Sequence, residues 1–538
     1  MLKKIIQIIL LSSLFVVVPK QVENSKIINE RHQKEELGEY GDTSKVTLAS
    51  DRTNVLIRLS DDSLDNYTRN NYPLKSDFKT HQRDKFNNHN NNFIKKLNVQ
   101  YDDIYISKYS PYVEFSYNSS STDKLNKSLD DLVKHDFVEE IYIQDDYKPA
   151  EMLGGAKYDS GTSSTLISTL SGGEDIKIGL LEYGICDKSN PNLTNSNITC
   201  RDEWYFIESK TEHATLMASI IVGSTGMAPN AHLYSVQLSG NPVSEVDWLI
   251  DKDISVCNVS IGDGTGSYSS SSSYLDYAAN TYGITFCCAT GNGGDDGDYV
   301  SNFSLANNCI AVGAGDETAV SSYTSTLTPS GQKRPLVIGP DTVAVSDFDT
   351  LYHSGTSVAT AVCTGVVALI QQYDSVHAYS PHYIRALLMA NCKEFANLNY
   401  QEDGYYLYGG AGRINLQNCI DNYSQVQLFN NYGDTNSTEF YTFTKTYVYT
   451  DDVYRTAVSY STRLVDDVPT RTNYGLRVFD AGNRITFDDN DSLNDSFEFL
   501  RGVALSDLEI TFSAYQNGTK PYSAYDILYV AYRVIPSN

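Results

Sequence analysis

The hydrophobic positions in the middle of the chain gather into short continuous runs separated by polar turns. Such runs occupy residues 178–185, 254–262, 284–292 and 310–314. Runs of this length are typical of strands that are buried on both faces of a parallel sheet. A longer apolar run over residues 362–370 follows a Gly-Thr-Ser turn and predicts a buried helix. Strands and helices that alternate in this way predict an α/β domain.

The chain on either side of this region has a different pattern. Residues 52–150 show strand and helix patterns in the order β-α-β-β-α-β, which suggests a ferredoxin-like α+β unit. Residues 424–538 have no long helical pattern but contain short strands separated by Asp and Asn turns, which predicts an all-β sandwich. With 538 residues, 41% of them hydrophobic, the chain is long enough for about three compact units.

The charge of the chain excludes one class of partner. The formal net charge is −26, and the basic residues form no stripe along the sequence. Nucleic acid is therefore not expected as a partner. A bulk acidic charge favours solubility outside the cell and does not by itself identify a basic substrate.

The first residues have the pattern of an export signal. Lys3 and Lys4 precede an apolar run over residues 5–18, which Pro19 ends. The run is too short to span a membrane comfortably, so we expect a signal peptide over residues 1–22 and a secreted or cell-surface protein. Because no small-x-small cleavage site follows, an uncleaved signal anchor is the alternative. No other run is long and apolar enough to be a transmembrane span.

Three polar residues stand at the ends of apolar segments in a fixed order. Glu182 follows the first buried strand, His213 lies at the start of an apolar helical pattern over residues 211–221, and Ser357 starts the later helix. Gly355 lets the backbone turn tightly, and a helix N-terminus offers free N–H groups to an oxyanion formed at Ser357. Alone, the Gly-Thr-Ser turn also suits an ordinary helix cap. The order acid, histidine, serine favours a catalytic interpretation.

In this order, the segments around Glu182, His213 and Ser357 resemble those of the subtilisin-like serine proteases, over roughly residues 155–423. The resemblance implies a subtilisin-like three-layer fold, in which helices cover both faces of a parallel sheet, and serine endopeptidase activity. It also implies Ser357 as the nucleophile, His213 as the general base and Glu182 as the acid that orients the base.

The resemblance extends to residues that bind the substrate and the oxyanion. Residues 284–292 are similar to the family's strand that ends in the oxyanion-hole asparagine, here Asn292. A plain turn residue before two glycines is the alternative for this position. Residues 254–262 are similar to the family's substrate-lining strand, which implies substrate contacts from Ser260, Ile261 and Gly262.

The chain departs from the family pattern at the acid. The family has Asp where this chain has Glu182, whose side chain is longer by one carbon–carbon bond, about 1.5 Å. Two smaller departures are Ala214 in place of Gly and Ala361 in place of Pro. The alternative function is therefore a catalytically silent subtilisin-like scaffold that binds or regulates a partner. We favour the enzyme, because the nucleophile, base and oxyanion donor are present and one acid replaces another.

The flanking units and the cofactors follow from the same resemblance. Residues 52–150 resemble an inhibitory propeptide, to be released by cleavage near residues 147–155; an accessory domain is the alternative. The expected partners are protein or peptide substrates and the chain's own propeptide as an intramolecular inhibitor. The chemistry needs no cofactor. Structural calcium is possible, at unknown sites: the acidic loop over residues 488–491 could supply oxygen ligands, although such a run is more often a solvated turn.

The nine cysteines all fall in the predicted catalytic region, and their odd number leaves at least one thiol free. Only Cys186 and Cys200 lie in a polar loop, which makes them the candidate pair for a surface disulfide. No Cys–His spacing suggests zinc. Four cysteines lie in apolar segments, where cysteine behaves as a small hydrophobic residue: Cys257, Cys287, Cys309 and Cys363.

Overall fold

A computed structural model gives the structure of the chain, which divides into two compact units. The N-terminal unit comprises Met1–Lys148, Leu238–Asp251 and Ser269–Ser271; the main unit comprises Pro149–Gln237, Lys252–Tyr268 and Ser272–Asn538. The structure describes residues 18–19, 26–30, 52–60, 75–118, 121–132, 134–144, 160–201, 209–240, 242–329, 331–345, 348, 352–395, 405, 408–431, 440–465, 468–470, 472–480, 495–517 and 526–537.

A seven-stranded parallel sheet forms the centre of the main unit, in the order β13-β12-β11-β10-β7-β9-β8. Every residue of β10, β11, β12 and β13 is buried, as expected for a parallel sheet covered on both faces. The predicted buried strands are thus confirmed. Their bounds are β7 Lys177–Glu182, β8 Asn197–Cys200, β9 His232–Gln237, β10 Val256–Val259, β11 Thr285–Ala289, β12 Ile310–Gly315 and β13 Val337–Pro340.

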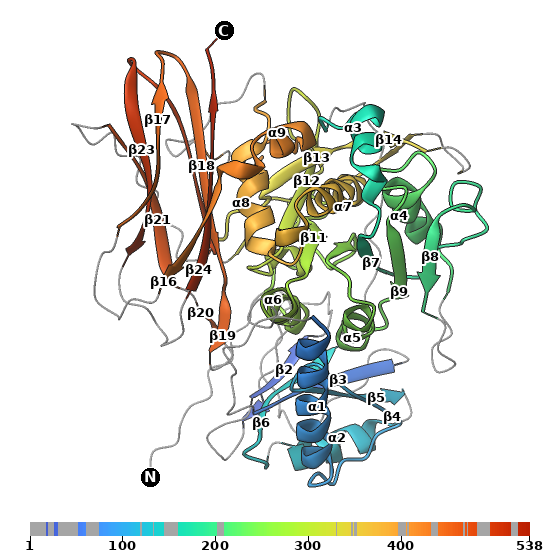
Figure 1. Cartoon of the computed structure of the whole chain (residues 1–538). Helices are drawn as coiled ribbons and strands as arrows, with labels where there is room; N and C mark the ends of the chain where they lie inside the picture. The colour runs from blue at the N-terminus through green and yellow to red at the C-terminus, as the bar shows by residue number, and fades with distance from the viewer. Residues whose placement is uncertain are drawn as a thin grey trace. The chain divides into compact units, whose positions relative to one another are not determined.

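Helices flank this sheet, and two of them carry candidate residues. The helix α7 packs on α4 and lies against β10, β11, β12 and β13 (Figure 1). A short antiparallel pair, β14 Thr342–Ala344 and β15 Tyr352–Ser354, leads into α7. The helices that lie wholly or mostly in the main unit are α3 Ser164–Thr169, α4 Glu212–Val222, α6 Ser270–Tyr282, α7 Thr356–Tyr373, α8 Pro381–Asn391 and α9 Leu416–Asp421.

The C-terminal part of the main unit is a sandwich of two antiparallel sheets, as predicted. One sheet has the order β16-β24-β18-β22 and the other β17-β23-β21. Their inward residues, among them Val458, Leu476 and Phe512, form one apolar core. The strands are β16 Val426–Asn431, β17 Phe440–Val448, β18 Val453–Tyr460, β21 Asn473–Asp480, β22 Phe497–Val503, β23 Leu508–Asn517 and β24 Asp526–Ile535, with the small hairpin β19 Arg463–Val465 and β20 Val468–Thr470.

Buried arginines join the sandwich to the rest of the main unit. Arg385 of α8 is 1% exposed and donates hydrogen bonds to Ser459 of β18 and to the carbonyls of Tyr460 and Ser496. Arg455 of β18 is fully buried and donates in the opposite direction, to backbone carbonyls of α8. The sandwich is therefore packed on α8 as one structure with the parallel-sheet region.

The N-terminal unit has the predicted β-α-β-β-α-β order. Its strands pair in the order β1-β2-β6-β3-β5-β4, and β3 lies antiparallel to both β5 and β6. This arrangement confirms the ferredoxin-like α+β unit. Its elements are β1 Val18–Pro19, β2 Lys26–Glu30, β3 Arg52–Leu59, α1 Lys75–Ile94, β4 Asp103–Ile106, β5 Tyr112–Asn118, α2 Thr122–Leu132 and β6 Val138–Gln144.

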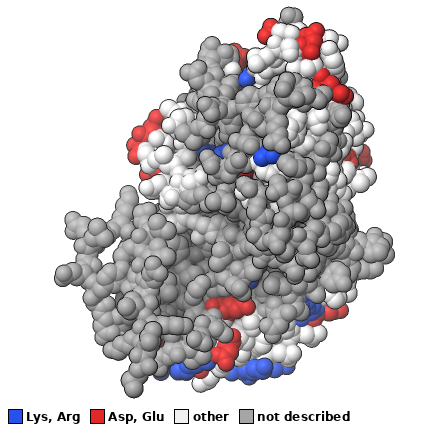
Figure 2. All heavy atoms as spheres, turned by 90° about the vertical axis from the view of Figure 1, so that its left-hand side faces the viewer, with Lys and Arg blue, Asp and Glu red and all other residues white. Residues whose placement is uncertain are grey.

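Two predictions fall mainly outside the described residues. Of the export signal, residues 1–22, only Val18–Pro19 is described, as a short strand. The cleavage region over residues 147–155 is not described. Among the described helices, none combines the length and the hydropathy that a membrane span requires. On the face shown in Figure 2, charged side chains of both signs are scattered over the described surface and adjoin in places.

Candidate active site

The three residues of the candidate triad lie at the ends of main-unit elements. Glu182 is the last residue of β7, and His213 and Ser357 are the second residues of α4 and α7. The side chain of Thr211 caps α4 by accepting a hydrogen bond from the Ala214 N–H. Each candidate group therefore stands where a regular element begins or ends, which is where α/β sheets place their ligands.

The acid and the base are in direct contact. Nδ1 of His213 lies 2.9 Å from Oε2 of Glu182. The Glu182 side chain is fully buried, and that of His213 is 15% exposed. Burial lowers the pKa of His213, but the charge of Glu182 and its hydrogen bond outweigh this effect, so the pKa is raised overall. The longer side chain of Glu182, at the end of β7, thus places its carboxylate in contact with the imidazole.

The nucleophile candidate is held by Ser260, directly after β10, and not by the histidine. The Ser357 hydroxyl donates to the Ser260 carbonyl at 3.1 Å, while the Ser260 hydroxyl donates to the Ser357 carbonyl at 3.1 Å. Asn258 in turn donates to the Ser260 hydroxyl at 2.9 Å. Nε2 of His213 is buried and has no hydrogen-bond partner among the described residues. The acid–base half of the expected triad is assembled, and the base–nucleophile hydrogen bond is not formed.

Asn292 is anchored to the start of α7 by its carbonyl oxygen. Oδ1 of Asn292 accepts hydrogen bonds from the backbone N–H and the hydroxyl of Thr356, both at 2.8 Å. These two bonds fix the position of the Asn292 side chain, including its amide nitrogen, which is the expected oxyanion donor. Gly355 has φ +133°, and a Cβ at this position would lie 3.2 Å from that nitrogen. A glycine therefore keeps the approach to the amide clear.

The three predicted substrate-lining residues lie in different surroundings. Ser260 exchanges hydrogen bonds with Ser357, as described above. The Ile261 side chain is 2% exposed, and a Cβ on Gly262 would come within 2.1 Å of the Ser301 hydroxyl. Gly262 is thus required by the close approach of Ser301.

Other acids and histidines near the candidate residues are engaged elsewhere. Asp187 pairs with Lys210 at 2.8 Å, and Asp175 precedes β7 in a turn with φ +67°. His353 lies on β15 with its ring 5.3 Å from that of Phe348. Of the described carboxylates, only Glu182 is hydrogen-bonded to His213.

The cysteines form no disulfide in this structure. All nine cysteines are free, and Sγ of Cys186 lies 4.0 Å from Sγ of Cys200. The candidate disulfide is therefore not formed, since a bond requires about 2.05 Å. Among the described residues, no group of three or more His, Cys, Asp or Glu side chains could hold a metal ion. The acidic loop over residues 488–491 lies outside them.

The fold and this site define a serine-type endopeptidase of the subtilisin class. The profile of the subtilase family matches residues 55–431, and the chain belongs to that family. It is 26% identical to subtilisin E of Bacillus subtilis (strain 168) over 332 residues, which cover 56% of this chain and 81% of that protein. Subtilisin of Bacillus pumilus is 27% identical over 269 residues, or 46% of this chain and 90% of that protein.

A solved structure extends the likeness to most of the chain. Fervidolysin from Fervidobacterium pennivorans, described as a keratinolytic enzyme related to subtilisin, matches with a TM-score of 0.50 and 15% identity. The match covers 90% of this chain and 70% of that one. At this identity the likeness shows the fold alone.

Proposed function

We propose that the chain hydrolyses peptide bonds with Ser357 as nucleophile, His213 as general base and Glu182 as the acid that orients the base. The observation that carries the proposal is the 2.9 Å hydrogen bond between the buried Glu182 carboxylate and Nδ1 of His213. This bond leaves Nε2 as the proton acceptor, as the triad mechanism requires. The chemistry draws on protein groups alone.

The reaction begins when the Ser357 hydroxyl leaves the Ser260 carbonyl and turns to the base. Its oxygen attacks the scissile carbonyl carbon while Nε2 of His213 takes the proton, and Glu182 stabilises the imidazolium. The Asn292 amide and the backbone N–H of Ser357 stabilise the oxyanion. His213 then gives the proton to the leaving amine. Water attacks the acyl group while His213 takes a proton from it, and His213 returns the proton to Ser357 as the acid product leaves.

One observation favours a second function, a catalytically silent scaffold that binds or regulates a partner. The Ser357 hydroxyl is hydrogen-bonded to a backbone carbonyl, at 3.1 Å, and not to His213. A serine held in this way is not activated. Hydrogen bonds between catalytic groups are often absent until the substrate binds, so we retain the enzyme as the main proposal.

A fluorophosphonate probe separates the two functions, because it reacts only with an activated serine. We expect the probe to label the wild-type protein at Ser357, and Ser357→Ala and His213→Ala to abolish the labelling. Ser224→Ala is the matched control, since Ser224 is an exposed serine beyond the end of α4. Absence of labelling in folded protein that lacks the residues before 150 would support the silent scaffold.

We also propose that the N-terminal unit acts as an inhibitory propeptide of an exported zymogen. Within this compact unit, residues 105–109 bond to α5 Val243–Asp251, which follows β9 and precedes β10 in the sequence. Asp247 accepts hydrogen bonds from the hydroxyls of Tyr105 and Ser107, both at 2.7 Å. Asp251 is hydrogen-bonded to Lys108 and Tyr109. Residues that precede the catalytic region are thus hydrogen-bonded to a helix whose sequence lies within that region.

N-terminal sequencing of the active protein from culture medium tests this second proposal. We expect the mature chain to begin after residue 144, where β6 ends, and a separately produced 52–150 fragment, if it folds, to inhibit it. An active species that begins near residue 20 would contradict the propeptide role. Protein found only inside the cell would contradict export.

A further inference from the structure

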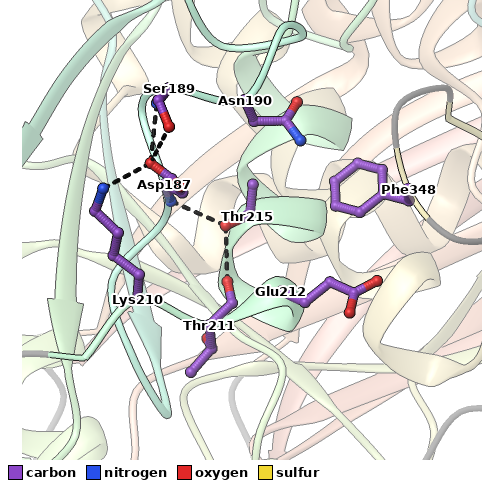
Figure 3. A pocket seen from close by; sticks show the side chains of 8 residues that line it. All are labelled: Asp187, Ser189, Asn190, Lys210, Thr211, Glu212, Thr215 and Phe348. Carbon is purple, nitrogen blue, oxygen red and sulfur yellow. Dashed lines mark hydrogen bonds and ion pairs between the residues drawn. The ribbon is translucent and has the colours of Figure 1, made fainter.

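A pocket of about 330 Å³ lies next to the proposed general base. Its lining includes Thr211, Glu212 and Thr215 from the first turns of α4, together with Asp187, Lys210 and Phe348 (Figure 3). Glu212 directly precedes His213 in the sequence, and consecutive Cα atoms are about 3.8 Å apart. The pocket therefore lies beside the turn of backbone that carries His213. The triad mechanism does not use this pocket.

Two of the charges in the pocket neutralise each other. Lys210 Nζ lies 2.8 Å from Asp187, which also accepts hydrogen bonds from the Ser189 N–H at 3.0 Å and the Ser189 hydroxyl at 2.7 Å. The hydrogen bond from Lys210, together with those from Ser189, lowers the pKa of Asp187 to about 2. The pair is thus fully charged at neutral pH, and its two charges largely cancel.

Glu212 carries the remaining charge in the pocket. Its side chain is exposed, and the structure records no hydrogen bond or ion pair for it among the described residues. Figure 3 shows its carboxylate on the same side as the Phe348 ring, while Asp187 and Lys210 face each other on the opposite side. The pocket therefore combines an unpaired anion with an aromatic face and carries a formal charge of −1 from Asp187, Glu212 and Lys210.

We propose that this pocket binds a lysine or arginine side chain of the substrate, so that the protease prefers a basic residue at one position near the scissile bond. The inference rests on the proposed peptidase function. The cationic group would pair with Glu212 and lie against Phe348, whose ring attracts a cation, while the apolar stem covers the aromatic surface. An acidic side chain would gain from the N-terminus of α4 and from Lys210. It would meet the charges of both Glu212 and Asp187, however, so the charge of the pocket favours a cation.

Peptide cleavage by the active protein as isolated from the medium tests the assignment. A peptide library with one varied residue at each position on either side of the bond identifies the preferred position. Two fluorogenic peptides that differ there only by arginine and its neutral isostere citrulline then give a ratio of kcat/KM values. An exposed ion pair and a cation–π contact together predict a ratio of about fivefold at low salt. The ratio should fall towards one at high salt, because salt screens the ion pair.

The variant Glu212→Gln removes the charge with little change of shape and should abolish the arginine preference, mainly through KM. Glu174→Gln is the matched control, because Glu174 is an exposed glutamate that precedes β7, at the end of the strand opposite Glu182. It should keep the preference.

The outcomes are distinct. A preference for arginine that survives in Glu212→Gln, equal cleavage of the two peptides, or a preference for an acidic residue would each overturn the pocket assignment, while fluorophosphonate labelling of Ser357 would leave the peptidase function standing. Failure of that labelling would overturn the peptidase function, and this inference with it.

Discussion

Shortening the acid of the proposed triad tests the catalytic proposal most directly. In Glu182→Asp the carboxylate withdraws by one carbon–carbon bond, about 1.5 Å. The distance from His213 Nδ1 to the carboxylate, 2.9 Å in this structure, would then grow to about 4.4 Å with the backbone fixed, which is too long for a hydrogen bond. The family's usual acid should therefore be the worse residue in this chain, because β7 and α4 are spaced for glutamate.

The size of the effect follows from that loss. A displacement of about 1 Å in a catalytic geometry can reduce turnover about 10²-fold. Glu182→Gln keeps the length but removes the charge that stabilises the imidazolium, and the corresponding change in another serine protease triad lowers kcat about 10⁴-fold. We expect the loss in Glu182→Asp to lie between these two values and that in Glu182→Gln to be the larger.

The pH dependence of kcat/KM provides a second readout. The neutral form of His213 is the base, so kcat/KM rises with pH through the pKa of this residue. Burial lowers that pKa, and the charge and hydrogen bond of Glu182 raise it above its ordinary value. In Glu182→Gln the charge that raises this pKa is lost, so the acid limb should move to lower pH. Full activity in Glu182→Ala, or an unmoved acid limb in Glu182→Gln, would refute the Ser357–His213–Glu182 triad.

Two further predictions concern the oxyanion donor and the sandwich. Asn292→Ala should lower kcat about 10²–10³-fold with little change in KM, the loss found for such a donor in subtilisin; steady-state kinetics on a neutral peptide measures it, and an unchanged kcat would exclude Asn292 from the oxyanion hole. Arg385→Met should destabilise the protein by about 3 kcal/mol, because the buried carbonyls of Asn307, Tyr460 and Ser496 each lose a hydrogen bond from the guanidinium. Urea unfolding of the probe-inactivated protein tests this, and a loss below about 1 kcal/mol would contradict it.

The sequence predicts the strands and the order of the site residues because both depend on local patterns. The runs over residues 178–185 and 284–292 contain β7 and β11, and Glu182 is the last residue of β7 as the pattern requires. What the sequence does not predict is the pairing of groups far apart in the chain. Ser260 and Ser357 are separated by 97 residues, and neither residue type indicates that they exchange hydrogen bonds.

The buried arginines mark the other limit of sequence-based prediction. Arginine is rarely buried in full, so a position such as Arg385 or Arg455 is expected at the surface. Here Arg385 of α8 donates to a backbone carbonyl at the end of β18, and Arg455 of β18 donates to backbone carbonyls at the end of α8. Burial lowers the pKa of Arg385 to about 10, which still leaves the side chain charged at neutral pH. Such an interface depends on the tertiary arrangement, and no local sequence pattern indicates it.

The acid of the proposed triad is the residue that the fold itself explains least. All other residues of β7 after Lys177 are buried and uncharged, as a central parallel strand requires, and a charged Glu182 at the end of such a strand is costly in free energy. One of its oxygens, Oε1, is buried without a hydrogen-bond partner among the described residues, and the other contacts a partly buried histidine. Replacing a buried ion pair by apolar residues of similar size is often neutral or stabilising. Buried strand positions normally carry uncharged residues. Where one position departs from this rule in a sequence that otherwise agrees with its fold, a functional site is expected. The conflict at Glu182 therefore supports catalysis independently of the family resemblance, since a scaffold that only binds would have no use for it.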